Sequence, residues 1–388
     1  MTMWVIGLVL LAFGGGVWLG ASRWRRLATE GSRDAVGLRL LHELAEGDYE
    51  HVAAELEAIC EAEPHEPAVF LALAAIDRHR GRLSRAKALH RVVLASSELE
   101  HDERVAGLVG LGRDLLTEGN VPAAAGALNR ANSLAPSSPA TLESLARALD
   151  RAGAWEPSAT AWERLERHVS GRRARAARVG RGRALAGQAL DALRLGETEK
   201  ARKLAARGLE LAPDSGFAWL VEARAAASAH DALVAWQRAW ELAGVGAGTI
   251  VAEGMQWARE NDRVAALVAR LRGSLRGTAH PASVVALASE LYDHDSEAAV
   301  SAWQRVADHS SEAQLALLRT AVAGLDLPGV EPALLEPGPS AFVCLACAAT
   351  VDEFAFRCSH CGRWDSLCDA RAPRRRTRQR LDDLPAAD

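Results

Sequence analysis

The apolar and polar positions divide the chain into segments of different periodicity. The first segment, Met3 to Ala21, runs for 19 residues without a charged side chain. As a helix at about 1.5 Å per residue it would extend roughly 28 Å, close to the ~30 Å hydrocarbon core of a bilayer. Trp4 and Trp18 lie near its ends, where indole rings favour the interface. The pattern predicts a transmembrane anchor over residues 1–22.

The charges that flank this segment predict its orientation. Arg23, Arg25 and Arg26 follow it, in a juxtamembrane linker over residues 23–34, and no Lys or Arg precedes it. The positive-inside rule then places the rest of the chain in the cytoplasm. A cleaved signal peptide is the alternative, but it favours a charged start and small residues before the cleavage site. The first three residues carry no charge, and Leu19 stands where a small residue belongs.

Residues 35–325 show a helical pattern that repeats. Five turn glycines recur at intervals of 34, 38, 34 and 43 residues. Four of the five residues that stand five positions after these glycines are small, as a close helix crossing requires, and a proline stands seventeen positions after three of the glycines. A period near 34 residues with helix, glycine turn and helix is the tetratricopeptide (TPR) signature. The glycines are Gly47, Gly81, Gly119, Gly153 and Gly196, and the prolines are Pro64, Pro136 and Pro213.

The pattern therefore predicts an all-α TPR superhelix, a solenoid, over residues 35–325. Two insertions lengthen the second and fourth intervals, within Ser96–Arg104 and near Arg172–Arg183. After residue 245 the repeat fades, but Met255–Arg272 and Val284–Ala307 still read as helix pairs.

Arginines dominate the predicted inner surface of this array. The first helix of each TPR lines the groove, and the family's groove positions map onto arginines from the second repeat to the sixth. A cationic groove would favour an acidic or phosphorylated segment, or a peptide carboxylate. The alternative is that a chain with 43 arginines carries many of them on helix surfaces without any partner. The mapped residues are Arg78, Arg113, Arg147, Arg151, Arg183, Arg194 and Arg224.

Composition and charge restrict the function classes. The 46 basic and 50 acidic residues nearly cancel, for a net charge of −4, which argues against a surface built wholly for nucleic acid. The arginine run over Arg172–Arg183 has no interleaved aromatic residue, so it indicates a solvated helix face rather than a single-strand platform. The chain has no His-Glu-x-x-His, Gly-x-Ser-x-Gly or phosphate loop, so we expect no enzyme.

Two Cys-x-x-Cys pairs form the most specific motif. A proline-rich linker over residues 326–341 precedes a module at 342–368 that holds Cys344, Cys347, Cys358 and Cys361. Reduced cytoplasmic thiols at this spacing indicate a tetrahedral metal site. Zn²⁺ is favoured over iron because nothing else suggests electron transfer, and four thiolates leave no open position for catalysis. A basic tail over 369–388 is expected to be disordered.

The order of anchor, TPR array and cysteine pairs resembles the lipopolysaccharide assembly protein B family of Gram-negative bacteria. The Arg80–Ala86 string with His90 downstream is similar to that family, as is Leu111–Asp114 in the third repeat. The four cysteines, followed by Trp364, match its rubredoxin-like zinc segment in spacing. Ala348 departs from it, because the family's first knuckle usually has glycine at that position.

This resemblance implies a non-catalytic adaptor at the cell inner membrane. It would regulate lipopolysaccharide biosynthesis by bringing the deacetylase of the lipid A pathway to a membrane-bound FtsH-type protease. It could also contact lipopolysaccharide transport or regulatory membrane proteins, and the zinc module is expected to pack on the TPR array. A generic TPR scaffold for an envelope assembly complex is the main alternative. An iron electron carrier, a nucleic-acid binder and a TPR co-chaperone are the rivals from other classes.

Overall fold

The computed structural model describes most of the helical array and the cysteine module. The described residues are 39–40, 42–62, 66–243, 247–274, 281–292, 294, 296–309, 311–322, 342–352, 354–360 and 362–369. The predicted anchor (1–22), juxtamembrane linker (23–34), proline-rich linker (326–341) and the tail from residue 370 lie outside them. Within the described ranges, no helix combines the length and the apolarity that a membrane crossing requires.

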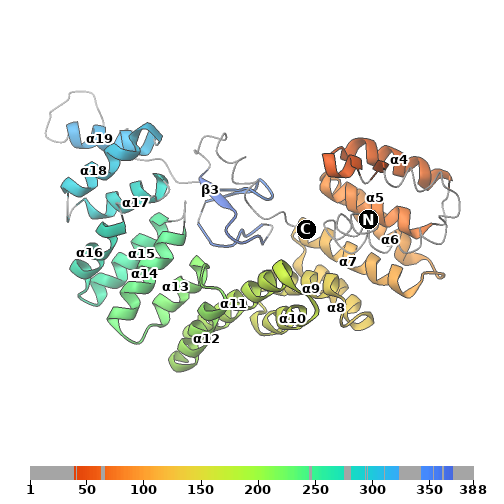
Figure 1. Ribbon diagram of the computed structural model, residues 1–388, viewed down its shortest axis with the longest axis horizontal. Coiled ribbons are helices and arrows are strands. Elements are labelled where there is room, and N and C mark those ends of the chain that lie inside the picture. The colour runs from red at the N-terminus through yellow and green to blue at the C-terminus, as the bar shows by residue number, and fades with distance from the viewer. Residues whose placement is uncertain are drawn as a thin grey trace. The chain divides into compact units, whose positions relative to one another are not determined.

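Antiparallel helix pairs follow one another along the chain and lead to a small sheet (Figure 1). The helices of the first half are α4 (Tyr49–Ala62), α5 (Pro67–His79), α6 (Leu83–Ala95), α7 (His101–Glu118), α8 (Val121–Leu134), α9 (Pro139–Ala152), α10 (Trp155–His168) and α11 (Gly171–Arg194). Those of the second half are α12 (Thr198–Leu211), α13 (Gly216–Ala225), α14 (Ala229–Ala243), α15 (Ala247–Glu260), α16 (Val264–Ser274), α17 (Pro281–Leu291), α18 (Ser296–Val306), the 3₁₀ turn η2 (Ala307–His309) and α19 (Ser311–Val322).

The recurring glycines end the first helix of each pair. All five adopt a positive φ, from 70° at Gly153 to 93° at Gly119, a region that L side chains enter only at a cost. The next amide then closes the helix end by bonding back to the last turn. Asn120 N donates to Leu115 O at 2.9 Å, and Ala154 N donates to Leu149 O at 2.9 Å. The glycine spacing in the sequence therefore marks real turns.

Small side chains lie where the paired helices cross. Ala86, Ala124, Ser158 and Ala201, five residues after their glycines, are all fully buried. Val52, at the same position in the first repeat, is also buried, with 1% of its surface exposed. The small side chains let the two helices of a pair approach closely, so that the pair buries an apolar stripe that neither helix could bury alone.

The fourth and longest interval between the turn glycines is accommodated by a longer helix rather than by a loop. The helix α11 has 24 residues, against 14 in α9 and α10, and it includes the whole arginine run from Arg172 to Arg183. After residue 245, α15 and α16 form one further pair and α17 and α18 another, as the fading pattern predicted.

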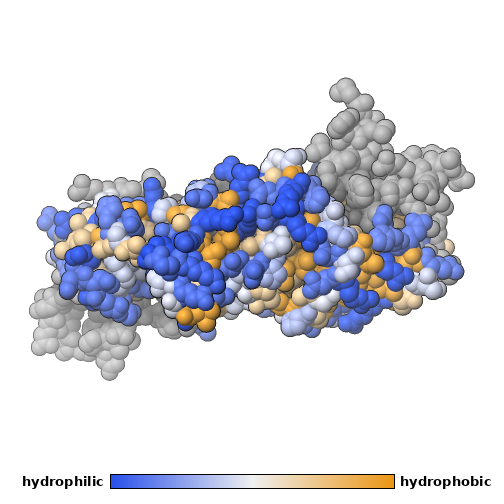
Figure 2. Space-filling model, turned by 90° about the horizontal axis from the view of Figure 1, so that it is seen from below, coloured by the Kyte–Doolittle hydropathy of each residue, from blue (hydrophilic) through white to orange (hydrophobic). Residues whose placement is uncertain are grey.

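The described helices divide into two compact units, with the boundary inside α11 between Ala177 and Arg178. In the first unit, separate apolar clusters form between successive helices, for example around Leu73 and around Leu128. In the second unit, a larger cluster is built around Trp236 and Trp240. Figure 2 shows one face of the molecule, on which hydrophilic residues are widespread and hydrophobic ones form small separate patches.

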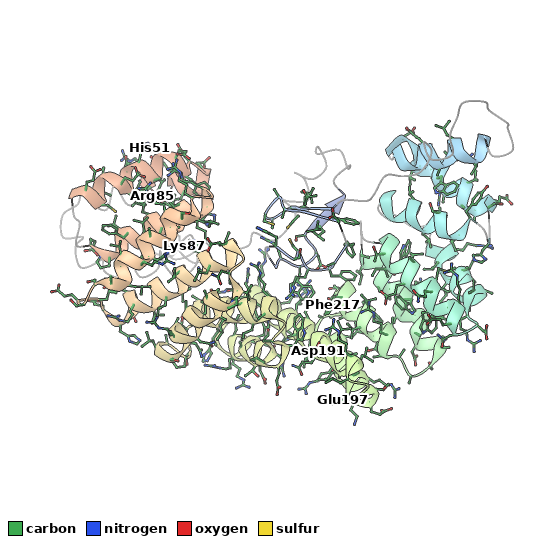
Figure 3. The ribbon with its side chains drawn as sticks, turned by 180° about the vertical axis from the view of Figure 1, so that it is seen from behind. His51, Arg85, Lys87, Asp191, Glu197 and Phe217 are labelled. Carbon is green, nitrogen blue, oxygen red and sulfur yellow. The ribbon has the colours of Figure 1, made fainter. Side chains whose placement is uncertain are left out.

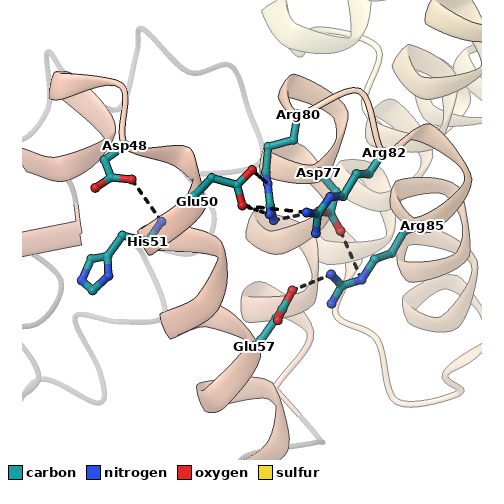
Figure 4. Close-up of polar contacts among 8 residues, drawn as sticks. All are labelled: Asp48, Glu50, His51, Glu57, Asp77, Arg80, Arg82 and Arg85. Atoms are coloured by element: carbon teal, nitrogen blue, oxygen red, sulfur yellow. Dashed lines mark hydrogen bonds and ion pairs between the residues drawn. The ribbon is translucent and has the colours of Figure 1, made fainter.

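A cluster of charged side chains joins α4 to the α5–α6 pair in the first unit (Figure 4). Arg80 donates from Nε to Glu50 at 2.9 Å, and Arg85 pairs with Glu57. Asp77 is fully buried between Arg80 and Arg85, each 3.4 Å away. Burial raises the pKa of the Asp77 carboxyl, while Arg85 and Arg80 act in the opposite direction.

The C-terminal module is a three-stranded antiparallel sheet in the order β2-β1-β3. Its strands are β1 (Phe342–Cys344), β2 (Thr350–Val351) and β3 (Leu367–Asp369). Phe342 pairs with Val351 on one side and with Asp369 on the other. Such short strands bury very little apolar surface, so other interactions must hold the module together.

Candidate metal centre and its helix platform

The two cysteine pairs adopt the same backbone turn. In the first, Cys344 N donates to Ala349 O at 2.9 Å and Ala348 N donates to Cys344 O at 2.8 Å. In the second, Cys358 N donates to Arg363 O at 2.8 Å and Gly362 N donates to Cys358 O at 2.9 Å. This repeated turn brings the sulfurs of Cys344 and Cys347 in the first loop close to that of Cys358 in the second.

Three thiols converge at one point. The sulfurs of Cys344, Cys347 and Cys358 all lie within 4.8 Å of one another, and the Cys347 and Cys358 sulfurs are 3.9 Å apart. A tetrahedral zinc ion with Zn–S bonds of about 2.3 Å sets sulfur–sulfur distances of about 3.8 Å. The described donor set therefore fits a thiolate-bound metal ion. Cys361, the fourth predicted ligand, lies outside the described residues.

Polar groups around Cys344 suit a charged sulfur. Ala346 N donates to the Cys344 sulfur at 3.4 Å, and Ser366 Oγ lies 3.1 Å from it. The Ser366 hydroxyl also lies 3.1 Å from the carbonyl of Arg363, so its single proton is given either to that carbonyl or to the sulfur. Donors of this kind stabilise a thiolate and orient it toward a metal ion.

The first loop carries a strained residue that the second loop avoids. Ala348 has φ 56°, while Gly362, at the matching position, has φ 73°. We predict that Ala348→Gly removes this strain and stabilises the loaded module by about 1 kcal/mol, and so slows metal loss to a competing chelator about fivefold. Ala349→Gly is the matched control, since Ala349 has no positive φ, and it should leave metal loss unchanged or faster. Equal release rates for the Ala348→Gly variant and the wild type would contradict the strain.

The module packs on helices of the second unit through Phe356. Its side chain is 5% exposed and belongs to the large apolar cluster of that unit. A Cβ atom built on Gly216, the first residue of α13, would stand 2.4 Å from Phe356 Cε1. Glycine is therefore the residue that lets the aromatic ring reach the helix backbone.

A second aromatic contact follows directly after the second cysteine pair. The Trp364 ring lies 5.1 Å from the Phe217 ring of α13, and the Arg183 guanidinium of α11 lies 5.1 Å from the Trp364 centroid. Figure 3 shows Phe217 on the side of α13 that faces the module. Arg183 also forms an ion pair with Asp365. Phe356, Trp364 and Asp365 together attach the module to α11 and α13, the packing that the family resemblance implies.

Each of the predicted groove arginines has a partner within the chain. Those of the second unit are ion-paired, Arg194 with Asp191 at 3.0 Å and Arg224 with Glu253 at 2.6 Å. Those of the first unit reach between neighbouring first helices or along their own helix. Arg78 pairs with Asp114 at 2.9 Å, Arg113 donates to Ser144 Oγ at 2.9 Å, Arg147 pairs with Glu143 at 2.7 Å, and Arg151 donates to Leu116 O. Their role as a partner groove stays a prediction.

Residues that attach the module to the helices were not singled out in the sequence as a platform. Gly216 and Phe217 come from helix α13, about 130 positions before the module, and no local pattern connects them to it. The module's own contact residues could have been found in the sequence. So small a module cannot bury all the aromatic residues beside its second cysteine pair, which are Phe354, Phe356 and Trp364.

No family model matches the chain, and no curated protein matches it. Solved structures similar to it include the C-terminal part of a TPR repeat-containing protein from Cytophaga hutchinsonii, with 15% identity, coverage of 74% of this chain and 99% of that one, and a TM-score of 0.41. A tetratricopeptide repeat protein from Parabacteroides merdae matches with 13% identity over 75% of this chain and all of its own, at a TM-score of 0.40. PilF of Pseudomonas aeruginosa matches with 15% identity over 55% and 93%, at 0.36. The helix pairs, turn glycines and small crossing residues described above give this chain the architecture of TPR repeats, and a cluster of cysteines follows them near the C-terminus.

Proposed function

We propose that the chain is a cytoplasmic TPR adaptor, anchored in the inner membrane by residues 1–22, that regulates lipopolysaccharide biosynthesis. In this proposal it presents the deacetylase of the lipid A pathway to an FtsH-type membrane protease. The observation that carries the proposal is the cysteine module attached to a TPR array through Phe356 and Trp364. That combination of parts is what the family resemblance rests on, and TPR arrays bind protein partners on extended surfaces.

The proposed metal has a structural role. Cys344, Cys347 and Cys358 would hold Zn²⁺ together with Cys361, and four thiolates leave no coordination position for a substrate. A zinc ion supplies folding free energy to a module that has almost no apolar core. Iron is the other metal that this donor set accepts, and a red colour of the purified protein would identify it.

The anchor would act through local concentration. Partners held beside the same membrane meet at an effective concentration far above their bulk value, so weak contacts suffice. A TPR array in the cytoplasm can then hold a soluble client while the anchor holds a membrane partner. The alternative is a scaffold for an envelope assembly complex that has a different client.

The deciding experiment measures the half-life of the lipid A pathway deacetylase in the native host, with and without this protein. We expect the half-life to lengthen at least severalfold on depletion, and re-expression of the wild-type chain to restore it. A variant without residues 1–22 is the matched test of the anchor and should fail to restore it. An unchanged half-life on depletion would contradict the proposed client and favour the assembly scaffold.

A further inference from the structure

Four arginines meet on neighbouring helices of the first unit. We call Arg78 of α5, Arg113 of α7, Arg147 of α9 and Arg173 of α11 the arginine cluster. They lie on the first helices of consecutive pairs, and three of them reach across to a neighbouring first helix. Arg78 contacts Asp114 of α7, Arg113 contacts Ser144 of α9, and Arg173 contacts Glu143 of α9 at 3.2 Å.

The carboxylates that pair with the cluster, among the described residues, are too few to balance it. Asp114 is fully buried and already holds the ring of His90, whose Nδ1 lies 2.6 Å from it. Glu143 is shared between Arg147 and Arg173. Four guanidinium groups thus face two carboxylates, which leaves a formal excess of two positive charges.

Arg113 carries the imbalance. Among the described residues, no carboxylate lies within ion-pair distance of its guanidinium, and its hydrogen-bond partner is the neutral hydroxyl of Ser144. Burial, and then the neighbouring charge of Arg78, lowers the pKa of Arg113 to about 10. Arg147 and Arg173 act in the same direction, and Glu143 opposes them. A desolvated cation among other cations destabilises the folded chain unless an anion joins it.

In the second unit, Arg183 shows which chemical group an arginine on one of these first helices can bind. Arg183 of α11 pairs with the carboxylate of Asp365 and lies over the ring of Trp364, so it binds an acidic residue that directly follows an aromatic one, here at a turn where Asp365 has φ 52°. The guanidinium fork fits a carboxylate with two parallel hydrogen bonds. The arginine cluster offers the same chemistry without a described segment bound to it.

We propose that the arginine cluster is the binding site for an extended acidic segment of a partner protein, with Arg113 as the anchor of one of its carboxylates. Neighbouring helices lie about 8–10 Å apart, and residues on one face of an extended chain recur at about 6.6 Å. Acidic residues in such a segment can therefore reach Arg113, Arg147 and Arg173 in turn. The site is narrower than the predicted groove. Arg194 and Arg224 each pair with a carboxylate of their own, whereas Arg147 and the added Arg173 share Glu143. The proposed site depends on the adaptor function in one respect only, which is that its ligand is a segment of a protein.

The test measures binding of a short fluorescein-labelled peptide of alternating Glu and Ala to the full-length chain in nonionic detergent, by fluorescence anisotropy at low salt. A peptide of alternating Gln and Ala is the reference. We expect the Glu peptide to bind at least tenfold more tightly than the Gln peptide, and Arg113→Leu to remove about tenfold of that affinity. Arg147→Gln should weaken binding in the same direction. Arg167→Gln, at an exposed arginine of α10 that pairs with Glu163 and lies outside the predicted groove, should leave it unchanged.

The thermal midpoint separates a binding role from a structural one. Because Arg113 lacks a carboxylate partner, Arg113→Leu should keep or raise the thermal midpoint while it lowers peptide affinity. The basic tail is present in every variant, so its contribution cancels in the comparison.

Equal binding of the two peptides would overturn the site. Unchanged affinity in both Arg113→Leu and Arg147→Gln would also overturn it. If the Arg113→Leu variant unfolds, Arg147→Gln alone decides. If a variant that has lost peptide binding still restores the normal deacetylase half-life, the site stands but its occupant is not the deacetylase.

Discussion

Replacing both Cys344 and Cys347 with serine will detach the cysteine module from α11 and α13. Loss of two ligands removes most of the metal-binding free energy, which is about 10–16 kcal/mol for structural zinc in small modules. The three short strands cannot replace it, because their apolar cluster is built largely from Phe342, Leu367 and the cysteines themselves. Without a fixed second loop, Trp364 and Asp365 lose the positions from which they contact Phe217 and Arg183.

The measurement combines metal content with limited proteolysis of the full-length chain. The double variant should lose its bound metal and be cleaved rapidly between residues 342 and 369, while the helical far-UV signal stays nearly unchanged. Cys60→Ser is the matched control, since Cys60 lies on α4, where burial raises the pKa of its thiol to about 11 and makes it a poor metal ligand. A double variant that retains metal and resists the protease would contradict the assignment of these ligands.

Gly182→Ala will destabilise the second unit more than an ordinary helix substitution does. A Cβ atom at this position of α11 would stand 2.7 Å from Gly208 O and 2.7 Å from Ala212 Cβ, both on or directly after α12. Neither atom belongs to a flexible side-chain end, so the two helices must move apart. We expect a loss of about 1–3 kcal/mol, which opposes and exceeds the usual gain of alanine over glycine inside a helix.

The matched control for this variant is Gly126→Ala. Gly126 lies inside α8, and nothing stands within 4 Å of a Cβ atom built on it. This substitution should therefore raise stability by about 0.5–1 kcal/mol. Thermal unfolding followed by circular dichroism should move the two midpoints in opposite directions. A Gly182→Ala midpoint at or above that of the wild type would show that the α11–α12 crossing can relax.

The sequence predicts the repeat better than it predicts the contacts between distant parts. The turns could be located because Gly119 and Gly153 meet a local requirement, a positive φ, that few other residues satisfy. The crossings could be located because Ala86 and Ala124 are small at a fixed distance from those turns. Both requirements act within one helix pair, so a single period in the sequence reports them.

The attachment of the module needs information that no local pattern contains. Phe356 packs against the backbone at Gly216, and a glycine at a helix start has several unrelated explanations. The same limit applies to the arginines. The sequence places Arg113 and Arg224 in the same category, but only the fold shows that Glu253 neutralises Arg224 while Arg113 has just the Ser144 hydroxyl.

The pairing of Arg183 with Asp365 joins residues 182 positions apart, and this has a consequence during synthesis. At about 5–20 residues per second, the ribosome needs on the order of ten seconds to extend the chain from Phe217 to Trp364. For that interval the helices of the platform exist without the aromatic side chains that cover them. Any chain that stops short of residue 342 keeps this apolar surface open permanently. Closure by the last-made segment thus distinguishes finished chains from truncated ones, and quality-control proteases that recognise exposed apolar surface can act on that difference.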